Sequence, residues 1–257
     1  MVAAALNPSR EKSGYFYVWM AGISALIAFG GFAPTYWLQL APGTFIGPPL
    51  LHIHGALFSA WTLLLLSQTW LAANGRLDHH RAWGLAGIGL ASAMLVVGIA
   101  AAIYSMKVGL AAGYGDKSRG FLLVPLSGIG LFAGFFVAAI VNINRSEVHK
   151  RLILLATISL LQAAVARVFF VIATGGGPGA RPGLGPPPPM AIALVPSLLL
   201  DLLIVAGMIY DWRRRGRPHP AWIVGLVVIS SVVLLRGPLS ETRSWIALAE
   251  SLGHIAG

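Results

Sequence analysis

The sequence contains no cysteine and few charged residues, and both absences restrict the class of protein it can encode. Without cysteine there is no disulfide, no thiolate metal site and no cysteine nucleophile. Only 10% of the 257 residues are charged, whereas a soluble globular domain carries about 25%. This composition excludes an ordinary soluble enzyme, a domain that binds nucleic acid and a disordered protein.

Hydrophobic residues make up 57% of the chain, and the mean hydropathy is +0.79. A helix needs roughly 20 apolar residues to cross the hydrocarbon core of a bilayer. Runs of about this length occupy residues 15–38, 50–73, 82–106, 120–142, 148–174, 190–212 and 219–236. We therefore predict an all-α polytopic membrane helix bundle, surrounded by the lipid bilayer and forming one integral membrane domain over residues 1–257.

Two segments depart from this pattern. Residues 175–190 are rich in Gly and Pro and are predicted to form an irregular connector. In residues 237–257, apolar side chains recur at nearly helical spacing, and Glu250 and Ser251 fall off their face. This tail is predicted to be an amphipathic helix that lies on the membrane surface or packs on a neighbouring subunit.

Lys and Arg in the connecting segments are divided unequally between the two sides of the predicted bundle. One side holds Arg10, Lys12, Arg76, Arg81, Arg145, Lys150, Arg151, Arg213, Arg214, Arg215 and Arg217. The other side holds Lys107, Lys117, Arg119, Arg181, Arg236 and Arg243. Because cytoplasmic loops carry the excess of basic residues, we predict a bacterial inner-membrane protein with a cytoplasmic N-terminus and a periplasmic C-terminus.

Two histidines, His80 and His149, lie at the starts of two different runs on the same predicted side. Two imidazoles from two helices are a usual way to hold haem b in a bundle. The neighbouring Arg81, Lys150 and Arg151 would suit haem propionates, a quinone or an anionic headgroup. The alternative role is to anchor the helix ends at the membrane interface.

On the other side, His52 and His54 begin the second run and are candidate metal ligands. Their i, i+2 spacing points them to nearly opposite sides of a helix, so at most one faces the core. Gly55 leaves room there for a neighbouring backbone or a flat ligand.

Two charged residues lie deeper, Arg167 in the fifth run and Asp201 in the sixth. Charged residues inside a membrane are costly and usually paired. From their depths we predict an Arg167–Asp201 ion pair in the outer half of the bundle, where it would either join two helices or line a pocket with His54.

Several membrane classes are excluded by missing residues. The last run contains no lysine for a retinal Schiff base, and the histidines are too few and too scattered for a di-iron hydroxylase. The sequence also has no G-x-S-x-G elbow and no P-loop.

Three strings carry a resemblance: HIHG at 52–55, HHRAWG at 79–84 and VHKRLILLATISLLQAAVAR at 148–167. Together they resemble a group of uncharacterised bacterial inner-membrane proteins with HxHG, HRxxG and HKRLxLLA motifs, over roughly residues 50–170. The His-Arg-x-x-Gly at the start of a run is more loosely similar to cytochrome b561-type haem proteins. That likeness implies haem b, and the histidines present suffice for one bis-histidine site.

Three functions follow as hypotheses. The first is a redox-linked protein that holds haem b or another histidine-bound metal. The second is an accessory subunit that packs among partner membrane subunits of a larger complex. The third is a small-molecule transporter or receptor with an outward pocket around His54, Arg167 and Asp201.

Overall fold

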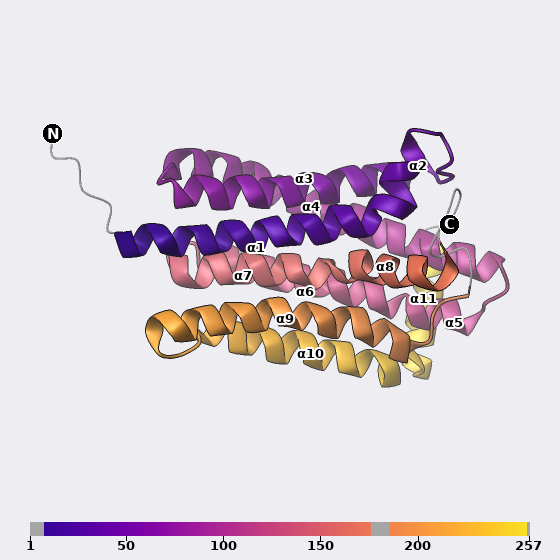
Figure 1. Cartoon of the computed structure of the whole chain (residues 1–257). Coiled ribbons are helices and arrows are strands. Elements are labelled where there is room, and N and C mark those ends of the chain that lie inside the picture. The colour runs from indigo at the N-terminus through magenta and orange to yellow at the C-terminus, as the bar shows by residue number, and fades with distance from the viewer. Residues whose placement is uncertain (1–7, 176–185, 256–257) are drawn as a thin grey trace.

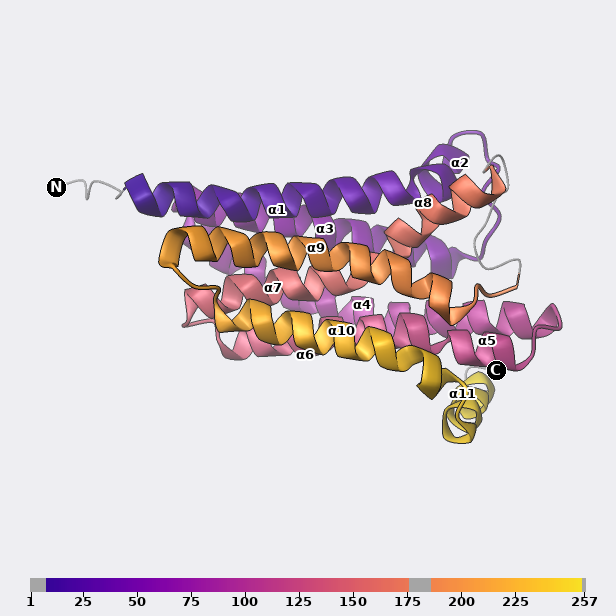
Figure 2. The ribbon, with the colours of Figure 1, turned by 60° about the horizontal axis from the view of Figure 1, so that its bottom comes forward.

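The computed structural model describes residues 8–175 and 186–255, and these form a bundle of helices (Figure 1). Seven helical segments are long and apolar enough to cross a membrane, which confirms the predicted all-α polytopic bundle. The segments lie roughly alongside one another, and only the C-terminal helix turns across one end (Figure 2). The first four spans are formed by α1 (Pro8–Phe32) with η1 (Ala33–Trp37) and α2 (Leu38–Leu40), α3 (Pro49–Ala73), α4 (Leu77–Ala111), and α5 (Asp116–Phe121) with α6 (Leu123–Val141). The other three are α7 (Ser146–Leu160) with α8 (Gln162–Thr174), α9 (Met190–Arg215) and α10 (Pro220–Ser240).

The outer surface of the bundle is apolar, as a lipid-facing surface must be. Leu26, Val141 and Ile172 are between 75% and 79% exposed, and many other large apolar side chains lie open in the same way. Water would disfavour so much exposed apolar surface, whereas hydrocarbon does not. The surface therefore agrees with the hydropathy of the seven spans.

The core lies around α7, which packs against α1, α6, α9 and α10. Its buried residues Leu155 and Ile158 belong to one large cluster with Phe132, Ile204 and Trp222. This central position brings the charged first turn of α7 into contact with several other helices, and that turn carries His149, Lys150 and Arg151.

The fifth span is two helices and not the single helix that its apolar run predicted. At the junction, the Leu161 and Ala164 amides bond to carbonyls three residues back, Ile158 and Leu161, at 3.1 and 3.0 Å. Beside the junction, α1 and α8 are in backbone contact, since a Cβ on Gly31 would lie 2.3 Å from the Ala164 carbonyl oxygen. Such a break inside a membrane is tolerated where the backbone is buried in protein.

The seventh span is longer than predicted and changes the place of Arg236. Helix α10 continues to Ser240, so Arg236 lies inside it and is only 3% exposed. Assigning Arg236 to an outer connection was wrong, because polar side chains of neighbouring helices hold its guanidinium within the bundle. Its removal from the outer group strengthens the asymmetry of basic residues.

The amphipathic tail is confirmed as α11 (Arg243–Ile255), and its apolar face packs on its own chain. Ala249 is fully buried against the cluster that includes Met106 and Leu122. Trp245 donates from Nε1 to the Arg119 carbonyl at 2.9 Å, and Glu250 lies 3.7 Å from the Arg119 guanidinium. The helix therefore ties the end of α10 to α4 and α5.

Most of the predicted Gly/Pro connector, with Arg181, lies outside the described residues. Its described end, 186–189, has no regular secondary structure and leads directly into α9.

Candidate functional site

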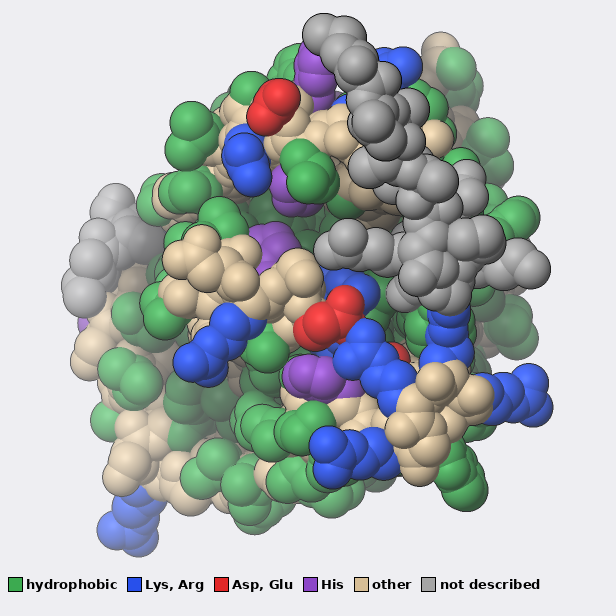
Figure 3. All heavy atoms as spheres, turned by 90° about the vertical axis from the view of Figure 1, so that its left-hand side faces the viewer, with side chains coloured by type: hydrophobic (Ala, Val, Ile, Leu, Met, Phe, Trp, Pro, Cys, Tyr) green, Lys and Arg blue, Asp and Glu red, His purple; other side chains and the backbone are tan. Residues whose placement is uncertain are grey.

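The candidate site lies at the end of the bundle where three tight turns join α3 to α4, α6 to α7 and α9 to α10. We call this the basic end, because Lys and Arg side chains gather on it with several histidines and few acids (Figure 3). The α3–α4 turn is short because Gly75 adopts a φ of +70°, the left-handed conformation that glycine accepts without steric cost. These turns place the first residues of α4 and α7 at the same end.

The structure brings His80 and His149 together. Their ring centres are 6.4 Å apart, and the ring planes are almost perpendicular, at 86°. His80 comes from the first turn of α4 and His149 from the first turn of α7. Residues 69 positions apart in the sequence thus face each other.

Backbone carbonyls hold both rings in one tautomer. His80 Nδ1 lies 3.3 Å from the Gln68 carbonyl oxygen, and His149 Nδ1 lies 2.9 Å from that of Ala139. A carbonyl can only accept, so Nδ1 is the donor in each ring and Nε2 carries the free lone pair. Metal-ligating histidines are commonly oriented in this way. The Ala139 carbonyl is one of the last four of α6. These carbonyls have no hydrogen-bond donor within their own helix, so His149 supplies one from α7.

The Gln68 side chain, whose backbone carbonyl holds His80, has a polar group without a partner among the described residues. Gln68 Nε2 is buried and makes no hydrogen bond in the described part of the chain. Its side chain lies beside Gly84, where a Cβ would meet only Gln68 Oε1, at 4.0 Å. An orphaned amide donor next to a glycine leaves a hydrogen-bonding position for a ligand at this end.

The neighbouring positions of α4 face outward. His79 is exposed, and Arg81 is 74% exposed with a weak 3.6 Å contact to Asp78. His79 therefore does not join the His80–His149 pair, and the Arg81 guanidinium is open to solvent or headgroups.

Lys150 and Arg151 are already occupied by carboxylates. Arg151 forms a bidentate salt bridge with Asp211, Nε to Oδ2 at 2.8 Å and Nη2 to Oδ1 at 2.5 Å, and both side chains are 1% exposed. Glu147 accepts from Lys150 at 2.6 Å and from Arg151 at 2.9 Å, and it also pairs with Arg215. Arg151 joins α7 to α9, whereas Lys150 pairs within α7. Both cations thus already have carboxylate partners, and a role toward propionates or headgroups stays a prediction.

This salt-bridge network was missed in the sequence, although one part of it left a signal. Glu147 precedes Lys150 and Arg151 by three and four residues, the spacing at which helical side chains meet. Asp211 lies two residues before a run of three arginines, Arg213–Arg215. These near neighbours are possible partners in the sequence, so nothing there indicates that Asp211 pairs with Arg151 of another helix. Lys150 and Arg151 also lie over the Tyr17 ring, at 4.6 and 5.8 Å from its centre, which brings α1 into the network.

His219 lies beside this network and caps α10. Its Nδ1 accepts from the Ala221 amide at 3.1 Å, and its own amide donates to Asp211 Oδ2 at 3.3 Å. Burial and then the nearby Arg151 charge lower the pKa of His219 below its ordinary value. The neutral imidazole is the form that can accept at Nδ1, so the low pKa and the cap agree.

The predicted Arg167–Asp201 ion pair is wrong. Arg167 lies over the Phe32 ring, 4.1 Å from its centre, and donates to the Ala163 carbonyl at 3.1 Å. Asp201 instead accepts from Ser230 at 2.9 Å, and its other oxygen has no partner in the described chain. Depth alone suggested the pair, and depth says nothing about direction around a helix. The two residues therefore do not line a pocket as an ion pair, and an outward pocket around His54 stays a prediction.

His52 and His54 also separate, as their spacing predicts. His52 is exposed and hydrogen-bonds through Nδ1 to the Tyr36 hydroxyl at 3.0 Å. His54 stacks on Phe58, with ring centres 4.1 Å apart, and its Nδ1 has no hydrogen-bond partner among the described residues. Across residues 8–175 and 186–255, no three His, Cys, Asp or Glu side chains are grouped to hold a metal ion.

Comparison of the chain with protein-family models, with curated proteins and with solved structures finds no match.

Proposed function

We propose that this integral membrane protein binds one haem b, with His80 and His149 as axial ligands, and carries electrons at the basic end of the bundle. When bound, a bis-histidine haem supplies reversible one-electron chemistry at its iron. The residues of this chain would supply the two imidazoles, their orientation and an amide donor.

The spacing of the two imidazoles carries the proposal. A histidine nitrogen binds a metal at about 2.0–2.1 Å. Two nitrogens on opposite sides of one metal are then about 4 Å apart, and their ring centres about 6 Å apart. The 6.4 Å separation of His80 and His149 fits this requirement.

The ligand set favours haem over a bare metal ion. Structural zinc sites need four protein ligands, and catalytic ones three. At this site the described residues bring together two imidazoles, fewer than either kind of zinc site needs, whereas a haem would itself supply the remaining ligands of its iron. The Nδ1 bonds to carbonyls leave Nε2 of both rings available, and Gln68 Nε2 is an unused donor on the helix whose carbonyl orients His80.

The test is an absorption spectrum of the full chain, expressed with haem in excess and purified in detergent. The wild type should show the Soret band of a low-spin haem at about one haem per chain. His80→Ala and His149→Ala should each abolish it, because each removes an axial ligand.

His79→Ala is the matched control, since His79 is the adjacent histidine and is exposed. It should keep the spectrum. A wild-type protein without a Soret band contradicts the proposal, and so does a spectrum that survives both ligand substitutions. Loss with His54→Ala alone would place the haem at the opposite end.

A further inference from the structure

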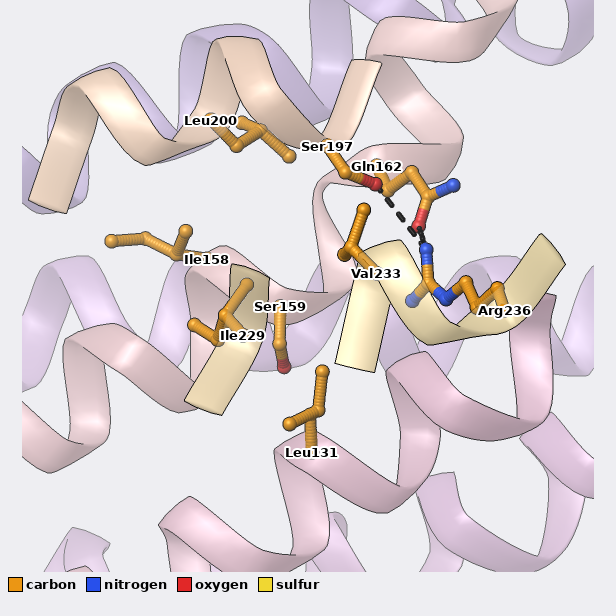
Figure 4. Close-up of a pocket in the computed structure, with 9 residues that line it drawn as sticks. All are labelled: Leu131, Ile158, Ser159, Gln162, Ser197, Leu200, Ile229, Val233 and Arg236. Atoms are coloured by element: carbon orange, nitrogen blue, oxygen red, sulfur yellow. Dashed lines mark hydrogen bonds between the residues drawn. The ribbon is translucent and has the colours of Figure 1, made fainter. Parts of the chain in front are cut away.

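A second polar centre lies inside the bundle, away from the histidines, around Arg236 of α10 (Figure 4). Its guanidinium is held by side chains from three other helices. Nε donates to Ser127 Oγ at 2.8 Å, and Nη1 donates to Gln162 Oε1 at 2.6 Å and to Ser197 Oγ at 3.3 Å. All three acceptors are uncharged.

No carboxylate compensates the charge of Arg236. Among the described residues it takes part in no salt bridge. An arginine does not deprotonate in proteins, so the positive charge stays. Burying an uncompensated charge is costly, and charged groups inside a membrane are paired or functional. Arg236 differs in this from Arg151, whose charge is matched by Asp211 and Glu147.

A small cavity adjoins the guanidinium. The centre of a water-sized sphere has about 10 Å³ of space in it, so the cavity holds one small species. Arg236, Gln162, Ser159 and Ser197 supply its polar lining, and the remaining walls are apolar. Arg236 Nη2 has no hydrogen-bond partner in the described chain, so the guanidinium retains unused donors.

The break in the fifth span lies at this cavity. Helix α8 begins at Gln162, whose side chain lines the cavity and accepts from Arg236. The Ala164 and Val165 amides of its first turn bond to the Leu161 carbonyl, so the Arg236 guanidinium is the group that would attract an anion.

We propose that this cavity binds one small monovalent inorganic anion of the chloride class, as the counter-ion of Arg236. A water molecule would satisfy hydrogen bonds there but would leave the charge uncompensated. The small volume favours a monatomic anion over sulfate or an organic carboxylate. This anion site is independent of the proposed haem site at the basic end.

The experiment measures the thermal melting of the purified full chain in sodium chloride and in sodium gluconate at equal ionic strength. Ligand binding to the folded state stabilises it by mass action. We expect Tm to rise by about 3 °C for each tenfold increase of chloride above its Kd. Bromide should act like chloride, and sulfate should act like gluconate.

Arg236→Gln should remove the chloride dependence, because it removes the charge that the anion compensates. Arg167→Gln is the matched control: it removes another arginine of the membrane segments, one that lies over Phe32, and should keep the dependence. Equal melting of the wild type in chloride and gluconate overturns the proposal. A chloride effect of the same size in Arg236→Gln also overturns it.

If Arg236→Gln does not fold, the wild type still decides the question by chlorine-35 NMR. Bound chloride should broaden the resonance beyond the level of a detergent blank, and bromide should reverse the broadening. Absence of broadening overturns the proposal.

Discussion

At the scale of single residues, the Arg151–Asp211 salt bridge joins α7 to α9, and both of its side chains are 1% exposed. Removing one partner of a buried pair leaves an uncompensated charge, at a cost of about 3–5 kcal/mol. We expect Asp211→Asn and Arg151→Gln each to lower the free energy of unfolding by about this amount. The double variant should lose less than the sum of the two, because the partners touch. Denaturant unfolding in detergent measures all three variants.

The chain contains its own control for this prediction. Asp78 and Arg81 are 97% and 74% exposed, and their contact is 3.6 Å. An exposed pair contributes about 0–1 kcal/mol, so Asp78→Asn should change stability little. Strict additivity of the two buried substitutions would show that Arg151 and Asp211 do not interact.

At the scale of elements, the start of α10 depends on a neutral histidine. His219 accepts the Ala221 amide at Nδ1, and its pKa in the folded protein lies below the unfolded value of about 6.5. As pH falls below about 6.5, the unfolded chain binds the proton first, so the free energy of unfolding decreases. Loss of an N-cap costs about 0.5–2 kcal/mol, which sets the size of this part of the pH dependence.

The measurement is thermal melting between pH 7.5 and pH 5, for the wild type and for His219→Asn. Asparagine caps a helix without titrating in this range. The variant should therefore lose less Tm than the wild type as pH falls. Identical slopes for the two proteins would refute a titrating cap at His219.

At the scale of the whole molecule, the asymmetry of basic residues predicts the orientation in the membrane. The N-terminal segment and the three turns at the basic end together carry 11 of the 18 Lys and Arg, so we expect this end to be cytoplasmic. A periplasm-dependent phosphatase fused at the C-terminus should be active, and a cytoplasm-dependent fluorescent protein fused there should be dark. Fusions within the α6–α7 turn, after residue 144, should give the opposite result. Fluorescence from the C-terminal fusion would contradict the predicted topology.

The composition and the apolar runs of the sequence were sufficient to predict the fold class. Membrane spans follow from local hydropathy because the lipid requires each segment to satisfy its own backbone. The amphipathic tail also follows from a local pattern. His80 and His149 both begin helices on one side of the bundle, and the structure places their rings 6.4 Å apart; their role as ligands stays a prediction.

The partners of buried charges could not be predicted in this way. Arg151 finds Asp211 sixty residues away, Arg236 finds only neutral oxygens, and Arg167 and Asp201 do not pair. Hydropathy and spacing give the depth of a side chain, but helix rotation and crossing decide which groups meet. The sequence by itself thus determined the spans and the amphipathic tail, whereas only tertiary packing decided which charges are paired and which one faces an internal cavity.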